Sequence, residues 1–262
     1  MFEEIVLHPI GILKSPQIEP YQASRQPDEH SSHAVIHLNS GFNFEQALTD
    51  LESCSHIWVI YKFHLNENWK PMVQPPRGEK KIGVFATRAP YRPNPLGLSV
   101  VKIEKIDGLK IHIGPNDILN DSPILDIKPY HPEYDRIDNA EISWLKKSTT
   151  RKHNVIFSPQ ADDQISFIER SDTSGKMKQL KLFILRQLEY EPTQHKKKRL
   201  EDHGSYWTLC YRTWRVDFIV QDLTVAVLSI RSGYTNEEIN SNDDPYQDKD
   251  LHKKYLHYLE QI

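Results

Sequence analysis

Apolar and polar residues alternate over short runs in the first half of the chain, as they do in strands with one buried face. β-branched and aromatic residues concentrate in six such runs, which we expect to be strands: residues 5–13, 33–38, 56–63, 82–85, 98–106 and 109–113. Asp107-Gly108 separates the last two runs and predicts a tight hairpin, because both residues tolerate a positive φ. Short strands joined by tight turns favour a closed or nearly closed β-barrel, which leaves no exposed edges.

One short helix and one long loop interrupt these strands. Asn43 is placed to cap the helix, and Ala47, Leu48 and Leu51 mark its buried side. Residues 66–81 form a polar, proline-rich loop. We expect this loop to lie over a ligand, with an unstructured connection as the alternative.

The composition changes at residues 136–160, where charged residues replace the apolar alternation, and we place a domain boundary there. The second unit is expected to open with helices at 164–170 and 177–188, because the apolar residues follow helical spacing. Three strands should then form a meander, at 206–212, 214–220 and 223–230. We therefore expect a small α+β domain over residues 160–235.

The last segment, residues 236–262, is an acidic tail. We expect it to be mobile from Asn236 to Asp250, since few apolar residues are available there to pack against the domain. A terminal helix from Lys253 to Ile262 is the expected end of the chain.

Length and charge restrict the classes of function. A chain of 262 residues can bury one large core or two modest ones. Its formal net charge of −3 argues against nucleic-acid binding by bulk charge, so any RNA contact needs local basic patches. The acidic start Met1-Phe2-Glu3-Glu4 is unlike a signal peptide, and no apolar run is long enough to cross a bilayer. Cys54 and Cys210 lack metal-type spacing and are expected to be reduced thiols in a cytoplasmic protein.

The segment from Ala86 to Ser99 carries the most informative chemistry. Three prolines stiffen its backbone, and Arg88 and Arg92 lie four residues apart on it. A stiff loop that holds guanidinium groups suits a flat or anionic ligand, because little conformational freedom is lost on binding. The alternative is a surface crossover with solvated arginines. A glycine-rich dinucleotide fingerprint and a Walker-type phosphate loop are both absent from the sequence.

This segment, the "signature loop", contains Thr-Arg-x-x-x-Arg-Pro-Asn-Pro-x-Gly-x-Ser, and Asp126-Ile-Lys-Pro-Tyr130 follows it. Together with residues 10–16, 25–27 and 56–64, these motifs resemble the TsaA-like family over about residues 5–135. Characterised members of that family are tRNA methyltransferases of the TrmO type. They use S-adenosylmethionine to methylate the exocyclic nitrogen of threonylcarbamoyladenosine, the modified base next to the anticodon.

The resemblance implies a mainly β fold: a TsaA-like β-barrel over residues 5–145 that binds S-adenosylmethionine, followed by the small α+β domain that assists tRNA binding. It also implies a homodimer. By the same resemblance, the residues that bind the cofactor are Ser24, Arg25, Gln26, Phe63, His64, Arg88, Leu98, Asp117, Ile118, Leu119 and Asn120. The chain departs from the family at Asn120-Asp121, where the usual pattern is Asp-Gly. Asn and Asp tolerate left-handed conformations, so the turn can survive the change.

No general base can be identified, and three residues remain candidates for catalysis. Asp126 could orient Arg88 or receive the proton, with a structural ion pair as the alternative. Arg92 could take part in the chemistry or contact tRNA phosphate, and Tyr130 could stack on a base or only pack. Arg88 itself has a structural alternative, a clamp on backbone carbonyls of the signature loop. His64, at a strand end, could equally be a capped structural residue.

Basic patches are the expected contacts with tRNA phosphates, and nearby aromatic residues could stack on a loop base. The patches are Lys146-Lys147, Arg151-Lys152 and residues 195–199, near Trp144, Tyr206 and Trp207 in sequence. Two other functions remain open: a barrel that binds an adenosyl ligand or RNA without chemistry, and a methyltransferase for a small molecule or another RNA.

Overall fold

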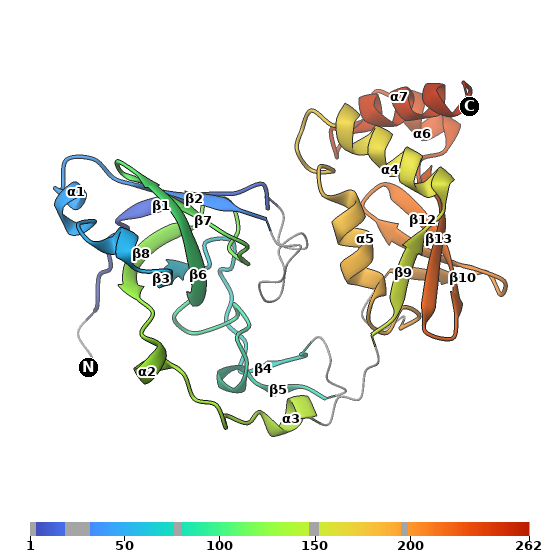
Figure 1. Cartoon of the computed structure of the whole chain (residues 1–262). Helices are drawn as coiled ribbons and strands as arrows, with labels where there is room; N and C mark the ends of the chain where they lie inside the picture. The colour runs from blue at the N-terminus through green and yellow to red at the C-terminus, as the bar shows by residue number, and fades with distance from the viewer. Residues whose placement is uncertain (1–3, 19–31, 76–79, 147–151, 195–198, 262) are drawn as a thin grey trace. The chain divides into compact units, whose positions relative to one another are not determined.

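The structure is a computed structural model that describes residues 4–18, 32–75, 80–146, 152–194 and 199–261. The chain forms two compact units, residues 1–149 and 150–262, drawn from blue to green and from yellow to red (Figure 1). We describe each unit by itself.

Six antiparallel strands of the first unit form a closed barrel in the order β1-β2-β7-β6-β3-β8. Closure comes from β8, which pairs back with β1 through Gly11 and Ile124. The strands are β1 (Gly11–Lys14), β2 (Ala34–Leu38), β3 (His56–Lys62), β6 (Leu96–Asp107), β7 (Lys110–Ile113) and β8 (Pro123–Pro129). Because side chains alternate across each strand, one set fills the barrel. The core includes Leu13, Ile36, Ile57, Val101, Ile111 and Ile124.

The first half is mostly β as predicted, but two of its elements differ from expectation. Residues 5–10 are not a strand, and Ile5, Val6 and Leu7 are exposed because no partner strand covers them. The predicted helix is a single turn, α1 (Phe44–Ala47), followed by a 3-10 turn, η1 (Leu51–Ser53). Asn43 adopts a left-handed conformation without capping the backbone, and its side chain bonds Gln46 instead.

A small hairpin begins in the long loop and ends just before the signature loop. Strand β4 (Met72–Val73) pairs with β5 (Ile82–Gly83), and the 3-10 turn η2 (Val84–Ala86) follows. The predicted strand at 82–85 is therefore half its expected length. Two further single-turn helices, α2 (Pro132–Asp135) and α3 (Ser143–Lys146), end the unit.

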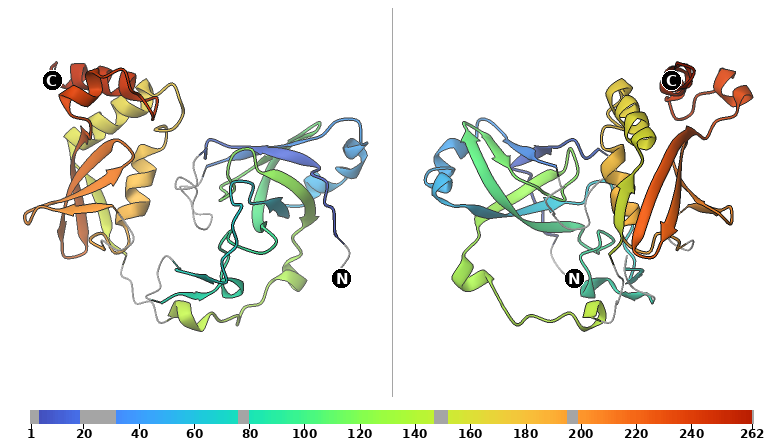
Figure 2. Two further views of the ribbon diagram at one scale, coloured as in Figure 1. Left: turned by 180° about the vertical axis from the view of Figure 1, so that it is seen from behind. Right: turned by 45° about the vertical axis from the view of Figure 1, so that its right-hand side comes forward.

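The second unit is a five-stranded sheet in the order β10-β11-β12-β13-β9, with helices α4 and α5 along one face (Figure 2). The predicted meander corresponds to β11 (Trp207–Tyr211), β12 (Trp214–Gln221) and β13 (Thr224–Ser232). The remaining elements are β9 (Asn154–Phe157), β10 (Leu200–Asp202), α4 (Pro159–Ser171), α5 (Leu180–Leu188), α6 (Asn236–Asn240) and α7 (Lys249–Leu259).

Two expectations for this unit were wrong. It opens with a strand, β9, which runs parallel to β13, and the helices come afterwards. The acidic tail contains two helices, α6 and α7, on either side of residues 241–248, and Thr235 and Glu238 form a capping box that starts α6. Helix α7 buries Tyr255 and His252 in the core, and His252 hydrogen-bonds Thr213 and Ser232. A capped start and a buried face fix the segment that composition alone marked as mobile.

Candidate functional site

The signature loop is held in shape by one of its two arginines. Nη1 of Arg92 donates to the carbonyl oxygens of Val84 at 3.2 Å and Thr87 at 2.9 Å. Its guanidinium lies 5.7 Å from the ring centroid of Phe85. Arg92 therefore fills the clamping role that the sequence had suggested for Arg88. Arg88, by contrast, is exposed.

A buried polar chain lies just inward of this loop. Ser99 Oγ donates to Asp117 Oδ1 at 2.7 Å, and Tyr61 Oη lies 3.4 Å from Ser99 Oγ. Burial raises the pKa of the Asp117 carboxyl, while the Ser99 hydrogen bond and the Arg88 charge oppose that rise. Arg88 is thus close enough to influence the Asp117 carboxylate. We call Tyr61, Ser99 and Asp117 the "inner triad".

Gly97 makes room for the inner triad. A Cβ atom on Gly97 would lie 2.3 Å from the Tyr61 ring, so only glycine lets that ring lie flat against β6. Gly97 and Ser99 are the last two defined positions of the signature motif. Sequence reasoning overlooked Tyr61 and Ser99, although the Gly-x-Ser spacing was a signal that one strand face needed a small residue and a hydroxyl.

The loop from Asn116 to Asn120 is fixed by buried amides. Asn116 Nδ2 donates to the carbonyl of Ser32, and its Oδ1 accepts from the backbone N–H of Ile118. Gln17 is fully buried, and its Nε2 donates to the Asn116 carbonyl at 2.9 Å. Gln17 Oε1 has no hydrogen-bond partner in the part of the chain that the structure describes. A buried acceptor without a hydrogen bond raises the free energy of the folded state, so a bound group that donates to this oxygen would be favoured.

The other residues of this loop that were predicted to bind the cofactor differ in their burial and contacts. Ile118 is fully buried in the barrel core, so any ligand contact from it must come from the backbone. Leu119 is half-buried, and its carbonyl closes the turn from Ser122. Asn120 Oδ1 accepts from the backbone N–H of Ser15 at 2.9 Å. Asp121, at the family's usual glycine position, has φ +62°, so the turn keeps its left-handed conformation as expected.

Phe63 and His64 lie where β3 ends. The Phe63 ring meets the Tyr61 ring edge-on at 5.3 Å between centroids. His64 Nδ1 lies 3.3 Å from Ser122 Oγ, and burial lowers the pKa of His64, which favours the neutral ring. These two residues are joined to the inner triad and to the loop after β7 by direct contacts.

An adenosyl group carries hydrogen-bond donors on its exocyclic amine and its ribose hydroxyls, and a site for it needs buried acceptors. The inner triad offers the Asp117 carboxylate, and Gln17 Oε1 offers a second acceptor in the adjoining loop. The hydrogen-bond acceptors on this side of the barrel therefore fit such a group. Among the described residues, no cluster of His, Cys, Asp or Glu could hold a metal ion.

The protein-family model for the tRNA-methyltransferase O N-terminal domain matches residues 12–136. A relative from Escherichia coli K12, named tRNA (adenine(37)-N6)-methyltransferase, is 32% identical over 81% of this chain and 90% of its own length. The chain belongs to the tRNA-methyltransferase O family. A Pyrococcus abyssi relative, named a probable S-adenosyl-L-methionine-binding protein, is 44% identical over 55% of this chain and 78% of its own length. A solved structure described as TrmO aligns with a TM-score of 0.58 at 26% identity, covering 87% of this chain and 99% of the other.

Three residues that the sequence proposed for the site lie on the outer face of the barrel. Leu98 is 53% exposed. Asp126 pairs with Lys128 at 3.0 Å, which matches the structural ion pair given as the alternative to a role beside Arg88. The reason is strand alternation: Asp126 and Lys128 are two residues apart and share a face, whereas Ile127 between them packs toward the core. The Tyr130 ring lies 5.8 Å from the Trp58 ring and packs against it.

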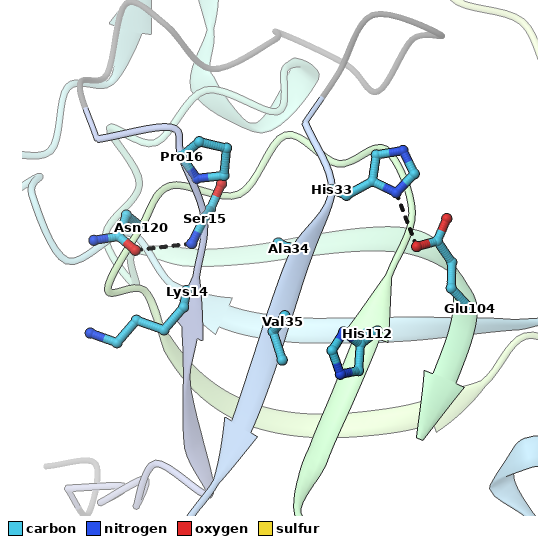
Figure 3. Close-up of a pocket in the computed structure, with 9 residues that line it drawn as sticks. All are labelled: Lys14, Ser15, Pro16, His33, Ala34, Val35, Glu104, His112 and Asn120. Atoms are coloured by element: carbon cyan, nitrogen blue, oxygen red, sulfur yellow. Dashed lines mark hydrogen bonds and ion pairs between the residues drawn. The ribbon is translucent and has the colours of Figure 1, made fainter. Parts of the chain in front are cut away.

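A shallow cavity of about 420 Å³ lies beside Asn120 (Figure 3). His33 faces Glu104 at 3.0 Å across one side of it, and Ser15 and Asn120 bond on the other. It is lined by Lys14, Ser15, Pro16, His33, Ala34, Val35, Glu104, His112 and Asn120. It therefore adjoins the predicted cofactor loop but does not include the inner triad.

Several predicted contacts lie outside the described residues, namely Ser24, Arg25, Gln26, Lys147, Arg151 and residues 195–198. In the second unit, Lys152 pairs with Glu189 at 3.2 Å, and the Tyr206 ring stacks on His203. In the first unit, Trp144 Nε1 donates to the carbonyl of Ala86 at 3.2 Å, which ties the end of the unit to the signature loop. No helix within the described ranges has the length and apolar character to span a membrane.

Proposed function

We propose that this protein transfers a methyl group from S-adenosylmethionine to the exocyclic nitrogen of threonylcarbamoyladenosine beside the tRNA anticodon. The observation that carries the proposal is the alignment with the Escherichia coli tRNA (adenine(37)-N6)-methyltransferase, which extends through both units of the chain. The name of the Pyrococcus abyssi relative supports the same cofactor. We place the reaction in the cytoplasm.

The cofactor site we propose is the side of the barrel formed by the inner triad, the end of β3 and the loop from Asp117 to Asn120. Arg88 and Leu98 border it by resemblance, as do Ser24, Arg25 and Gln26. When bound, S-adenosylmethionine supplies an electrophilic methyl group. The chain's part is to orient the acceptor and to exclude water, and neither task needs a metal or a covalent intermediate.

Within that site, we assign the Asp117 carboxylate to accept hydrogen bonds from the adenosyl group. Ser99 occupies one carboxylate oxygen from inside the barrel, so the other can face a ligand. Gln17 Oε1 supplies a second acceptor. Asp126 and Tyr130 do not belong to this site, because both lie in packing or ion-pair contacts on the barrel's outer face.

The assembly and the second unit complete the proposal. We propose a homodimer in which two barrels associate, and a role in tRNA docking for the α+β unit. Support for both comes from the family resemblance. The alignment with the TrmO structure covers 87% of this chain and so includes residues of the second unit.

Mass analysis of nucleosides tests the function directly. Purified protein, S-adenosylmethionine and tRNA should yield the methylated form of threonylcarbamoyladenosine, and tRNA without the threonylcarbamoyl group should yield none. A protein that binds the cofactor without methylating any tRNA would instead be an adenosyl-binding module. Methylation that ignores the threonylcarbamoyl group would contradict the proposed substrate.

A further inference from the structure

Phe85, directly before the signature loop, exposes an unusually large apolar surface. Its side chain is 75% exposed, although it lies between a buried residue, Val84, and two arginines. A single exposed apolar residue needs no explanation in general. Phe85 differs because the structure around it holds its backbone rigidly.

Six hydrogen bonds fix the turn that carries Phe85. The Val84 N–H donates to the Pro71 carbonyl at 3.0 Å, and the Thr87 N–H and Oγ1 both donate to the Val84 carbonyl. Trp144 Nε1 donates to the Ala86 carbonyl, and Arg92 clamps both ends of the turn. A ring presented on a fixed turn loses little conformational entropy when it binds a flat partner.

The charges around the ring identify the kind of partner. The Arg92 guanidinium lies near one side of the ring, at 5.7 Å from its centroid. In the described parts of residues 66–92, the basic residues are Lys70, Lys80, Lys81, Arg88 and Arg92, and the acidic residue is Glu67. Such a surface is complementary to a polyanion, and a second copy of the same face would meet it with like charge.

An aromatic ring within a basic loop is suited to a single-stranded nucleic acid. Unpaired bases of RNA loops stack on aromatic side chains, and lysines contact the phosphates between them. We propose that Phe85 is a stacking platform for an unpaired base of the tRNA anticodon loop, and that Lys80 and Lys81 contact its backbone. This inference rests on the proposed function, because it takes tRNA to be the substrate.

Binding of an anticodon stem-loop RNA tests the platform. The RNA carries 2-aminopurine at one loop position next to the target adenosine, and its fluorescence falls when the base stacks. Phe85→Leu should weaken RNA binding roughly 5- to 100-fold, the range for one lost base–aromatic stack, and should abolish the quenching. Phe85→Trp should retain both, because a larger ring still stacks.

Phe42→Leu is the matched control, since Phe42 is 68% exposed in the same unit but stacks on Phe44 away from the signature loop. It should leave RNA affinity unchanged. The Lys80→Ala/Lys81→Ala variant should reduce the slope of log Kd against log salt concentration, and Phe85→Leu should not. Equal affinity and quenching in wild type and Phe85→Leu, at every loop position probed, would overturn the platform.

Measurements of cofactor binding and of methylation distinguish a failure of this inference from a failure of the proposed function. Calorimetry should show that Phe85→Leu binds S-adenosylmethionine as the wild type does. If the wild type methylates tRNA while Phe85→Leu binds the RNA equally well, the platform is wrong and the function stands. If the wild type neither binds nor methylates tRNA, the proposed function fails and the platform fails with it.

Discussion

Replacing Gly97 with alanine should destabilise the barrel by driving the inner triad apart. The new Cβ would lie 2.3, 2.4 and 2.7 Å from three atoms of the Tyr61 ring, where carbon atoms normally approach to about 3.5 Å. The ring must therefore retreat by about 1 Å. It is only 4% exposed and abuts Phe63, so there is no free space to enter. Overpacking of this kind costs about 1–3 kcal/mol, against a gain of about 0.5–1 kcal/mol from removing glycine in a strand. The net expectation is a loss of about 1–2 kcal/mol.

A double-mutant cycle with Tyr61→Leu isolates the clash. In that background, Gly97→Ala should be neutral or stabilise by up to about 1 kcal/mol, because the ring that it strikes is gone and the gain from removing glycine remains. The coupling energy should exceed about 1 kcal/mol. Hydrogen exchange of the β3 and β6 amides, measured together with urea unfolding, reports the stability of the first unit alone. Gly83→Ala is the matched control: it also lies in a strand, but its Cβ would meet no atom within 4 Å. Equal costs for Gly97→Ala with and without the Tyr61 ring would refute the reasoning.

Four further predictions concern charge and hydrogen bonding. Asp117→Asn should weaken S-adenosylmethionine binding at least about tenfold, as measured by calorimetry. It should leave the free energy of unfolding unchanged or higher, because burial raises the pKa of this carboxyl and the ionised form therefore destabilises the folded state. Ser99→Ala removes a hydrogen bond that favours the ionised form, so the loss of cofactor affinity on acidification should begin at a higher pH. Burial lowers the pKa of His252 to about 4, so below about pH 6.5 the unfolded chain takes up a proton at this residue while the folded second unit keeps it neutral. In urea unfolding, the free energy of unfolding should therefore fall by up to about 3 kcal/mol between about pH 6.5 and 4. The fall should be smaller in His252→Gln. Arg92→Lys should speed hydrogen exchange over residues 84–92, since lysine is one bond shorter than the arginine that reaches both carbonyls and has no planar group to lie against the Phe85 ring.

Each of these has an outcome that would contradict it. A destabilised Asp117→Asn variant with normal cofactor affinity would make the inner triad purely structural. An unchanged pH dependence in Ser99→Ala would break the link between that hydroxyl and the carboxylate. A flat stability profile below pH 6.5 would mean that His252 is charged in the folded unit. Arg88→Lys is the control for Arg92→Lys and should leave exchange over residues 84–92 unchanged.

Local patterns predicted those elements whose packing follows from the chain itself. The strand at His56–Lys62 alternates β-branched and aromatic residues, and the hairpin at Asp107-Gly108 places a glycine at positive φ. The meander of the second unit has the same origin. The wrong predictions concern segments whose structure depends on what they pack against. Residues 5–9 have strand-like composition but pair with no strand among the described residues. The acidic tail folds because a capping box and the buried Tyr255 outweigh its charge.

For the site, the sequence by itself determined the stiff signature loop, its two arginines and the Gly-x-Ser spacing that ends it. Only the tertiary structure decided which arginine clamps the loop, that Asp126 turns outward to Lys128, and that Tyr61, Ser99 and Asp117 meet inside the barrel. The physical reason is that backbone stiffness and strand alternation are local properties of the chain. Hydrogen bonds between residues 18 and 38 positions apart depend on the pairing of β3 with β6 and on the course of the loop after β7, which bring three separate segments to one place.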